Sequence, residues 1–214
     1  KDKSEATIAV TGGKFHKFNP AYNVSENPKK NFAGNNTMVA VSGTEGNEVY
    51  EVIDLSNGYT MTSDVIIATP ITINTTGSID FNLSTYHLTN KTAYDYDNCG
   101  ETECYVFEVK AGTLNITGTT GSVNAIGGSD YDMAVFANTN GKVNISGGKF
   151  TNLGKENDGS DLIYARDNAV VTISGGEFEA GNKSSDVGGQ YVALNLKDKS
   201  EATIAVTGGK FHKF

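Results

Sequence analysis

Four segments in the second half of the chain share one pattern of hydrophobic and polar positions. Each reads as a strand, a short turn, a second strand and a corner that contains glycine. The segments are Tyr105–Gly118, Met133–Phe150, Leu162–Phe178 and Tyr191–Phe211. In each second strand two aliphatic residues alternate with polar ones, the period of two that is typical of a β-strand with one buried face. The predicted buried pairs are Leu114/Ile116, Val143/Ile145, Val171/Ile173 and Ile204/Val206.

The spacing of these segments predicts that they stack on one another. Ile116, Ile145, Ile173 and Val206 follow one another at intervals of 29, 28 and 33 residues, within the range of repeats that form stacked supersecondary units. We therefore expect coils of a solenoid, with equivalent residues in ladders about 4.8 Å apart, the distance between neighbouring strands. The first strands are expected to align Phe107, Phe136, Tyr164 and Leu194, and a second ladder is expected from Phe150, Phe178 and Phe211.

A pair of glycines precedes each phenylalanine of the second ladder at a fixed offset. Such a pair predicts a corner where the backbone needs a positive φ or a close approach to a neighbour. The predicted structural corners are Gly147, Gly148, Gly175, Gly176, Gly208 and Gly209. The first segment departs from this pattern, with GTTGSV in place of the glycine pair, and the fourth has a longer turn at Lys197–Glu201.

The part of the chain before these four segments is less regular. Gly58–Thr89 predicts earlier coils of the same stack, and Asn19–Ile53 predicts an irregular wrap followed by a hairpin. We expect this segment to cover the end of a stack, because an open terminal coil exposes unpaired backbone groups. The predicted fold class is therefore all-β, a right-handed parallel β-helix (solenoid) with an irregular capping segment and a hairpin.

The chain contains the same block, KDKSEATIAVTGGKFHKF, twice. Lys1–Phe18 and Lys197–Phe214 are identical and lie 196 positions apart. Identity at every position indicates a window on a tandem array, or an engineered permutation or splice, and we expect the natural protein to be longer than this chain. Residues 1–18 are then the last coil of a preceding repeat, residues 19–53 a cap and hairpin that join modules, and residues 54–214 the β-helix module.

Composition and charge exclude several partners. The net charge of -8 and the single arginine, Arg166, argue against nucleic acid, since its binders cluster Lys and Arg. The longest apolar run, around Val65–Ile73, is interrupted by Thr69 and Pro70 and is far shorter than the roughly 20 residues of a membrane-spanning helix. We therefore expect no membrane segment.

Several stretches resemble a known family. SDVIIATPITINTTGSIDFN resembles the opening of the right-handed parallel β-helix (pectate-lyase-like) domains of surface and virion proteins of gut bacteria and their phages. ISGGKF, ISGGEF and VTGGKF resemble the glycine-pair rungs of these domains, and FHKFNPAYNVSENPKKNF resembles the segment that closes them. The resemblance implies an extracellular, cell-surface or virion location. It specifies a fold and leaves the activity open.

Catalysis is not predicted. Polysaccharide lyases and hydrolases need carboxylates that converge beside a base or on one bond. Arg166 and Asp167 are adjacent, and consecutive strand residues point to opposite faces, so they are not expected to converge. Arg166 is interpreted as a solvated charge at a strand end, and the chain as not an enzyme.

The acidic residues predict an ordered edge. Several acidic residues precede the first strand of successive coils, so stacked turns would align them along one edge. Ca²⁺ is the one candidate cofactor, because it prefers oxygen ligands, and its weak candidate ligands are Asp130, Asp158 and Asp161. Ordinary solvated turns are the other interpretation. Candidate sugar-binding residues near this edge are Tyr94, Tyr96, Tyr131 and Asp130, with corner packing as the alternative. Cys99 and Cys104 are a candidate disulfide if the compartment is oxidising, and otherwise free thiols.

The sequence is compatible with three functions. The first is a structural repeat module of an extracellular or virion fibre, whose partners are copies of itself or adjacent repeats. The second is a carbohydrate-binding adhesin or receptor-binding module for a host glycan. The third, least favoured, is a polysaccharide lyase or hydrolase.

Overall fold

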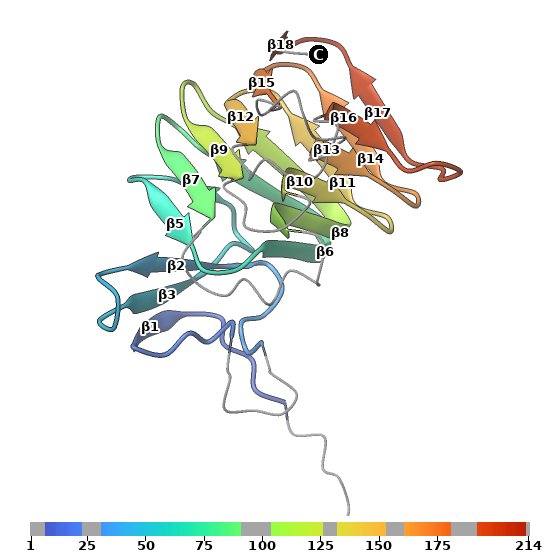
Figure 1. The fold of residues 1–214 in the computed structure, drawn as a ribbon. Helices are drawn as coiled ribbons and strands as arrows, with labels where there is room; N and C mark the ends of the chain where they lie inside the picture. Colours follow the sequence, from blue (N-terminus) through green and yellow to red (C-terminus); the bar gives the residue numbers. More distant parts are fainter. Residues whose placement is uncertain are drawn as a thin grey trace, which may run out of the picture.

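The computed structural model describes residues 7–22, 31–90, 104–125, 132–152, 161–180 and 192–212 (Figure 1). Within these ranges every regular element is a β-strand and no helix is present. Among the described strands, only the pairs β1–β3, β2–β3 and β2–β5 are antiparallel, and the other paired strands run parallel. The prediction of an all-β protein is confirmed.

The second half of the chain forms four stacked segments, which we name rungs 1 to 4. They are residues 104–125, 132–152, 161–180 and 192–212. Rung 1 contains β8 (Cys104–Thr117) and β9 (Ser122–Ala125). Rung 2 contains β10 (Asp132–Ala137), β11 (Lys142–Ile145) and β12 (Lys149–Asn152). Rung 3 contains β13 (Asp161–Ala165), β14 (Val170–Ile173) and β15 (Glu177–Glu179), and rung 4 contains β16 (Val192–Leu196), β17 (Thr203–Val206) and β18 (Lys210–His212).

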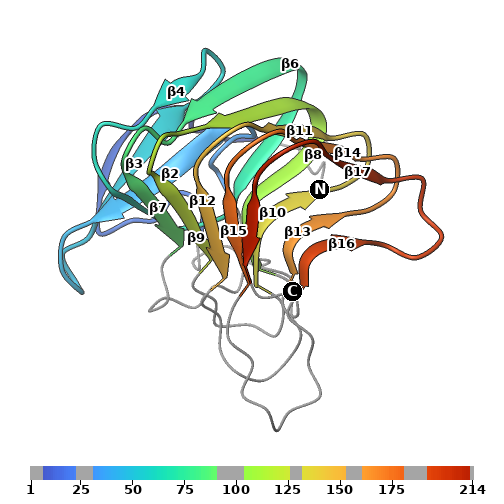
Figure 2. The same ribbon diagram turned by 90° about the horizontal axis from the view of Figure 1, so that it is seen from above.

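The strands form two sheets, which face one another across the core (Figure 2). Sheet A has the order β1-β3-β2-β5-β7-β9-β12-β15-β18. Sheet B has the order β16-β13-β10-β8-β11-β14-β17, with β6 paired to β8 and β4 to β6. The remaining strands are β1 (Gly13–His16), β2 (Thr37–Ser42), β3 (Val49–Asp54), β4 (Tyr59–Thr60), β5 (Val65–Ile67), β6 (Ile71–Asn82) and β7 (His87–Asn90).

The predicted register of the second strands is confirmed. Ile145 of β11 pairs with Ile116 on one side and with Ile173 on the other, and Ile173 pairs with Val206. Ile116, Ile145 and Ile173 are fully buried in the main core. Each such side chain contributes roughly 1.5–3 kcal/mol when it is removed from water, so the repeated pattern itself supplies much of the stacking energy.

In rungs 2 to 4 a third strand follows the glycine corner, and it was not predicted as a strand from the sequence. Phe150, Phe178 and Phe211 lie in β12, β15 and β18 and pair in register, as expected for the second ladder. Their rings stack with centroids 5.0 and 4.8 Å apart. These strands are only three or four residues long, too short for an alternation of hydrophobic and polar residues to stand out.

The expected ladder in the first strands was wrong at two of its four positions. Phe136 does pair with Tyr164, but Phe107 pairs with Val135, and Leu194 pairs with Ile163. Ala134, Val135 and Phe136 are all buried, so both faces of β10 are apolar. A strand that is buried on both faces has no period-two pattern. Aligning the first strands by their aromatic residues therefore placed Phe107 and Leu194 one residue out of register.

The hairpin predicted before the regular segments is present in sheet A, between β1 and β5. β2 and β3 pair antiparallel, and β2 also pairs with β5 (Figure 1). Met38 of β2 belongs to the main core, whereas the next residue, Val39, belongs to a second cluster with Ala21, Val41, Tyr50 and Val52. The hairpin therefore separates two hydrophobic clusters, one packed against each of its faces.

Candidate functional site: a groove along the glycine corners

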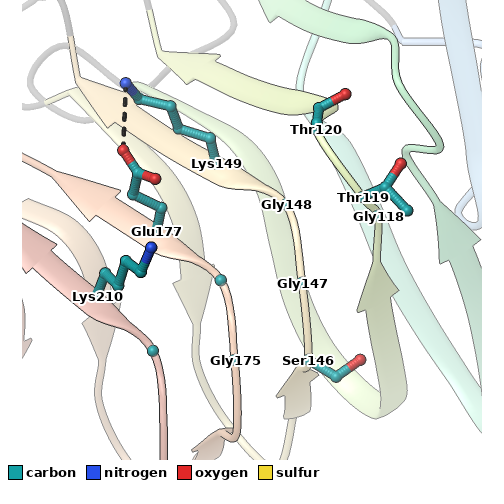
Figure 3. Close-up of a pocket in the computed structure, with 12 residues that line it drawn as sticks. Gly118, Thr119, Thr120, Ser146, Gly147, Gly148, Lys149, Gly175, Glu177 and Lys210 are labelled. Carbon is teal, nitrogen blue, oxygen red and sulfur yellow. Dashed lines mark ion pairs between the residues drawn. The ribbon is translucent and has the colours of Figure 1, made fainter.

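A groove with a volume of about 710 Å³ follows the glycine corners of rungs 1 to 4 (Figure 3). The corners connect the last two strands of each rung, so the groove runs along the stack rather than across one rung. The lining residues are Gly118, Thr119, Thr120, Ser146, Gly147, Gly148, Lys149, Gly175, Gly176, Glu177, Gly209 and Lys210.

Backbone atoms form the floor of the groove, because the corner residues are glycines, which have no side chain. The two glycines of each corner have different structural roles. A Cβ on Gly175 would overlap the carbonyl oxygen of Ser146 in the preceding rung. Gly176 has φ +98°, in the left-handed region that side chains disfavour, and a Cβ there would lie 3.1 Å from the carbonyl oxygen of Gly148. The first glycine thus permits close approach of two rungs, and the second permits the turn.

Backbone hydrogen bonds join the corners of successive rungs. The N–H groups of Lys149, Glu177 and Lys210 each donate to a glycine carbonyl of the rung below, at 2.9 Å in all three cases. The accepting glycines are Gly121, Gly148 and Gly176. Because these N–H and carbonyl groups are hydrogen-bonded between rungs, the corners extend the hydrogen-bond ladder of the adjoining strands.

Charged side chains along the rim pair with one another. The Lys149 Nζ lies 3.1 Å from Glu179 Oε2 and 3.6 Å from Glu177 Oε1, the second contact being drawn in Figure 3. His212 Nε2 lies 3.3 Å from the same Glu177 oxygen. The hydrogen bond to Glu179, more than the charge of Glu177, raises the pKa of the Lys149 ammonium. The rim therefore presents polar and mutually compensated charges to solvent.

Most of the predicted ion and sugar ligands lie outside the described residues. These are Asp130, Asp158, Tyr94, Tyr96 and Tyr131, together with Cys99 of the candidate disulfide; Cys104 is the first residue of β8. Asp161 is described: it begins β13, is 8% exposed, and its Oδ2 accepts a hydrogen bond of 2.8 Å from Asn195 of the next rung. Within the described ranges, no group of three or more His, Cys, Asp or Glu side chains is arranged to hold a metal ion.

Arg166 and Asp167 do converge, contrary to the sequence-based expectation. Both follow the end of β13, and Asp167 has φ +60°, so the alternation of side chains along a strand does not apply to them. Arg166 Nε lies 3.7 Å from Asp167 Oδ2, and the guanidinium carbon lies 4.8 Å from the centre of the Phe136 ring. The arginine covers an aromatic side chain of the neighbouring rung.

One buried carboxylate was not predicted from the sequence. Glu108 of β8 is 5% exposed, and its Oε1 accepts a hydrogen bond of 3.0 Å from Asn138 Nδ2. Its Oε2 accepts from Thr72 Oγ1 at 3.2 Å and lies 3.1 Å from Lys110 Nζ. The Glu108 side chain thereby links β6 and β8 to the residue that follows β10, and a charged residue inside the apolar run VFEV is the signal that identifies it.

Comparison of the chain with protein-family models, with curated proteins and with solved structures finds no match. None of the described segments forms a helix with the length and apolar character needed to cross a bilayer.

Proposed function

We propose that the chain is a structural repeat module of an extracellular or virion fibre, built as a right-handed parallel β-helix and joined to further modules in tandem or head to tail. The observation that carries this proposal is that sheet A begins and ends with the same peptide. β1 and β18 are its two edge strands, and both come from the duplicated block. A rod whose two ends carry one shared strand is suited to repetition along its axis.

The stacking of the rungs supports a role in stiffness. Ladders of fully buried residues run through sheet B at Ile116, Ile145 and Ile173, and through sheet A at Phe150 and Phe178. Each further rung adds about 4.8 Å of length and buries the same kinds of side chain. Protein interiors are close-packed and yield little to deformation, so such a stack resists bending.

The length of engineered arrays tests this proposal. We would express one, two and three copies of the 196-residue period with the shared block at each junction, and measure the maximum dimension by small-angle X-ray scattering. A straight fibre lengthens in proportion to the number of copies. A control array with about 20 Gly/Ser residues at each junction behaves as flexibly linked beads. Arrays that bend like this control would overturn the proposal.

A carbohydrate-binding adhesin or receptor-binding module is the second candidate. The groove along the glycine corners favours it, since ligand sites are concave with a few placed polar groups, here Lys149 and Lys210. A glycan array compares the unaltered chain with Lys149→Ala/Lys210→Ala and with the matched control Arg166→Ala. Binding that is lost only in the double variant supports this function, whereas an unaltered chain that binds no glycan removes it.

A polysaccharide lyase or hydrolase is the least favoured function. The contacts of Arg166 with Asp167 and Phe136 give no support to a role as catalytic base. Incubation with acidic polysaccharides, with and without Ca²⁺, tests the point directly, and the appearance of new reducing or unsaturated ends would establish an enzyme.

A further inference from the structure

We propose that the chain forms a covalent bond within itself, in which the Lys110 amine displaces ammonia from the Asn138 side-chain amide while Glu108 carries the protons. The product is an isopeptide bond, an amide between two side chains, and it joins rung 1 to rung 2. The reaction takes place within one chain and goes beyond the proposed function, which does not depend on it.

The backbone brings Lys110 and Asn138 next to one another. Val109 of β8 pairs with Ala137 of β10, and the residues that follow continue this contact. The N–H of Asn138 donates to the Val109 carbonyl at 2.9 Å, and the N–H of Asn140 donates to the Lys110 carbonyl at 3.1 Å. Lys110 therefore lies beside the turn that begins at Asn138.

The Glu108 carboxylate holds both reacting groups. Lys110 Nζ lies 3.1 Å from Glu108 Oε2, and Asn138 Nδ2 donates to Glu108 Oε1 at 3.0 Å. Thr72 Oγ1 donates to Oε2 at 3.2 Å and so helps to fix the carboxylate. The amine and the amide are thus neighbours on the two oxygens of one carboxylate. Groups held together in this way react as if their concentration were about 10⁵–10⁸ M when they are well oriented.

The surroundings suit Glu108 to the transfer of protons. Glu108 is 5% exposed and Asn138 is 3% exposed, whereas the Lys110 side chain is 44% exposed. Water therefore competes little for the carboxylate and the amide, and the open side at Lys110 lets ammonia leave. Proton transfer needs heavy atoms about 2.6–3.2 Å apart, and the contacts of Glu108 with both nitrogen atoms lie in this range.

The bond forms by addition to the amide carbon. Glu108 accepts a proton from the Lys110 ammonium, and the lone pair of the freed Nζ attacks Cγ of Asn138. The π electrons of the Cγ–Oδ1 bond move onto Oδ1, which accepts a hydrogen bond of 3.3 Å from Thr139 Oγ1 in the structure. A donor at this position stabilises the negative charge that develops on the oxygen.

Loss of ammonia completes the reaction without any further reagent. Glu108 passes its proton to Nδ2 of Asn138 and takes a second proton from Nζ. The Cγ–Nδ2 bond breaks, and the electrons on Oδ1 form the new carbonyl group. Ammonia leaves and takes the last proton from Glu108 as ammonium, so the carboxylate is regenerated.

The position of Glu108 in the stack supports this role. Glu108 pairs with Phe136, and Phe136 pairs with Tyr164, so aromatic residues occupy the equivalent position in rungs 2 and 3. Burial of a charge costs free energy unless the charge is paired and hydrogen-bonded. Stacking alone does not explain a carboxylate at this position, whereas the proposed reaction requires one.

The product closes a covalent loop from residue 110 to residue 138, across the junction of two rungs. Such a link restricts the conformations of the unfolded chain. Rungs 1 and 2 then cannot separate at this point while the backbone is intact.

Mass spectrometry of the intact full chain tests the proposal, both as purified and during prolonged incubation. The folded chain should lose about 17 Da, the mass of one ammonia molecule, and a protease digest should contain a branched peptide that joins Lys110 to Asn138. The same incubation in guanidinium chloride should leave the mass unchanged, because unfolding separates the reacting groups. Lys142→Arg is the matched control: Lys142 is an exposed lysine of β11, and this variant should lose ammonia as the parent does.

Three variants each remove one reacting group. Lys110→Arg and Asn138→Ala should keep their full mass and give no branched peptide. Glu108→Gln retains the shape of the side chain without the proton acceptor, and should form the bond at least about a hundredfold more slowly. Circular dichroism and thermal melts establish that the variants are folded. If Glu108→Gln does not fold, Lys110→Arg still decides the matter, because its side chain is half-exposed.

A folded parent chain that keeps its full mass overturns the proposal. A loss of about 17 Da that persists in Lys110→Arg also overturns it, because the ammonia then comes from an asparagine that cyclises onto the backbone, for which Asn140–Gly141 is a candidate sequence. Neither result bears on the fibre proposal, which fails only if covalent arrays bend like their flexibly linked control.

Discussion

Phe178 and Phe211 stack with their ring centroids 4.8 Å apart and their planes 13° from parallel. The same geometry relates Phe178 to Phe150 on its other side, at 5.0 Å and 8°. The rings follow the spacing of the strands that carry them, because the backbones of Phe150, Phe178 and Phe211 are paired in register. One phenylalanine in each of rungs 2 to 4 therefore contributes to a column of rings along the core side of sheet A.

Phe178 is the middle ring of this column and is fully buried. Phe178→Ala should lower the free energy of unfolding by about 3–5 kcal/mol, through lost burial and the cavity that remains. Ile66→Ala is the matched control, because Ile66 is a sheet A residue that is 46% exposed; its cost should stay below about 1 kcal/mol. Urea denaturation measures both, and equal costs would show that the column does not support the stack.

Close approach at the glycine corners predicts a contrast between two glycines. Gly175→Ala places a Cβ against the Ser146 carbonyl, whereas a Cβ on Gly77 meets no atom within 4 Å. We expect Gly175→Ala and Gly176→Val each to lower the free energy of unfolding by about 1–3 kcal/mol or more through overpacking. Gly77→Ala should leave stability unchanged or raise it by roughly 0.4–1 kcal/mol. Thermal melts of the variants decide the matter, and a Gly175→Ala protein as stable as the parent contradicts the corner geometry.

Replacing Glu108 should lower the free energy of unfolding by more than replacing its partner Lys110. Glu108→Ala leaves the buried Asn138 amide without its 3.0 Å acceptor and should cost about 1–3 kcal/mol. Lys110→Ala removes only a half-exposed member of the pair, and should cost less than about 1 kcal/mol. Chemical denaturation of both proteins, measured against the parent chain without the Lys110–Asn138 amide, gives the comparison. If Lys110→Ala were the more damaging change, the role of Glu108 in linking strands would be wrong.

Arg166 should matter little for stability. Its side chain is 38% exposed, and it contributes one contact over Phe136 and one ion pair with Asp167. Arg166→Ala is expected to cost no more than about 1 kcal/mol, the size of an exposed cation–π contact. A thermal melt that ranks this variant below Gly176→Val would contradict the assignment of the arginine to the surface.

Tyr50 should make the hairpin sensitive to alkali. Burial first, and the nearby Glu48 carboxylate second, raise the pKa of the Tyr50 phenol above its ordinary value of 10.0. Above that pH the unfolded chain releases the proton more readily than the folded chain, so the stabilisation is present below pH 10.0 and is lost as the pH rises through the folded-state pKa. Tyr50→Phe should weaken the decline in unfolding free energy above pH 10.0. An identical decline in parent and variant would contradict this.

Periodicity alone predicted the second strands and their register. Leu114, Val143 and Val171 alternate with polar residues, and this alternation was enough to align three rungs correctly. The phenylalanines after the glycine pairs were also aligned correctly. In the second strands the aliphatic face is buried and the polar face is more exposed, which is the condition under which a local sequence pattern records a tertiary position, whereas the phenylalanines were aligned by their fixed offset from the glycine pairs.

Other features depended on contacts between segments far apart in the chain. Both faces of β10 are buried and apolar, so the sequence pattern did not fix its register, and the structure alone showed that Phe107 pairs with Val135 and Ile163 with Leu194. The candidate ligands Asp130, Asp158 and Tyr94 lie outside the described residues, so their role stays a prediction. The groove along the corners was not predicted, since it forms only when glycines of different rungs lie side by side.

The duplicated block shows most directly what each level of description decides. The sequence by itself determined that residues 7–16 and 203–212 are the same peptide and that it has the pattern of a strand, a glycine corner and a phenylalanine. Only the tertiary structure decided that one copy pairs antiparallel with β3 and the other parallel with β15. The physical reason is that a strand has two hydrogen-bonding edges of equal chemistry, and the choice between them depends on which neighbours the rest of the fold brings to each edge.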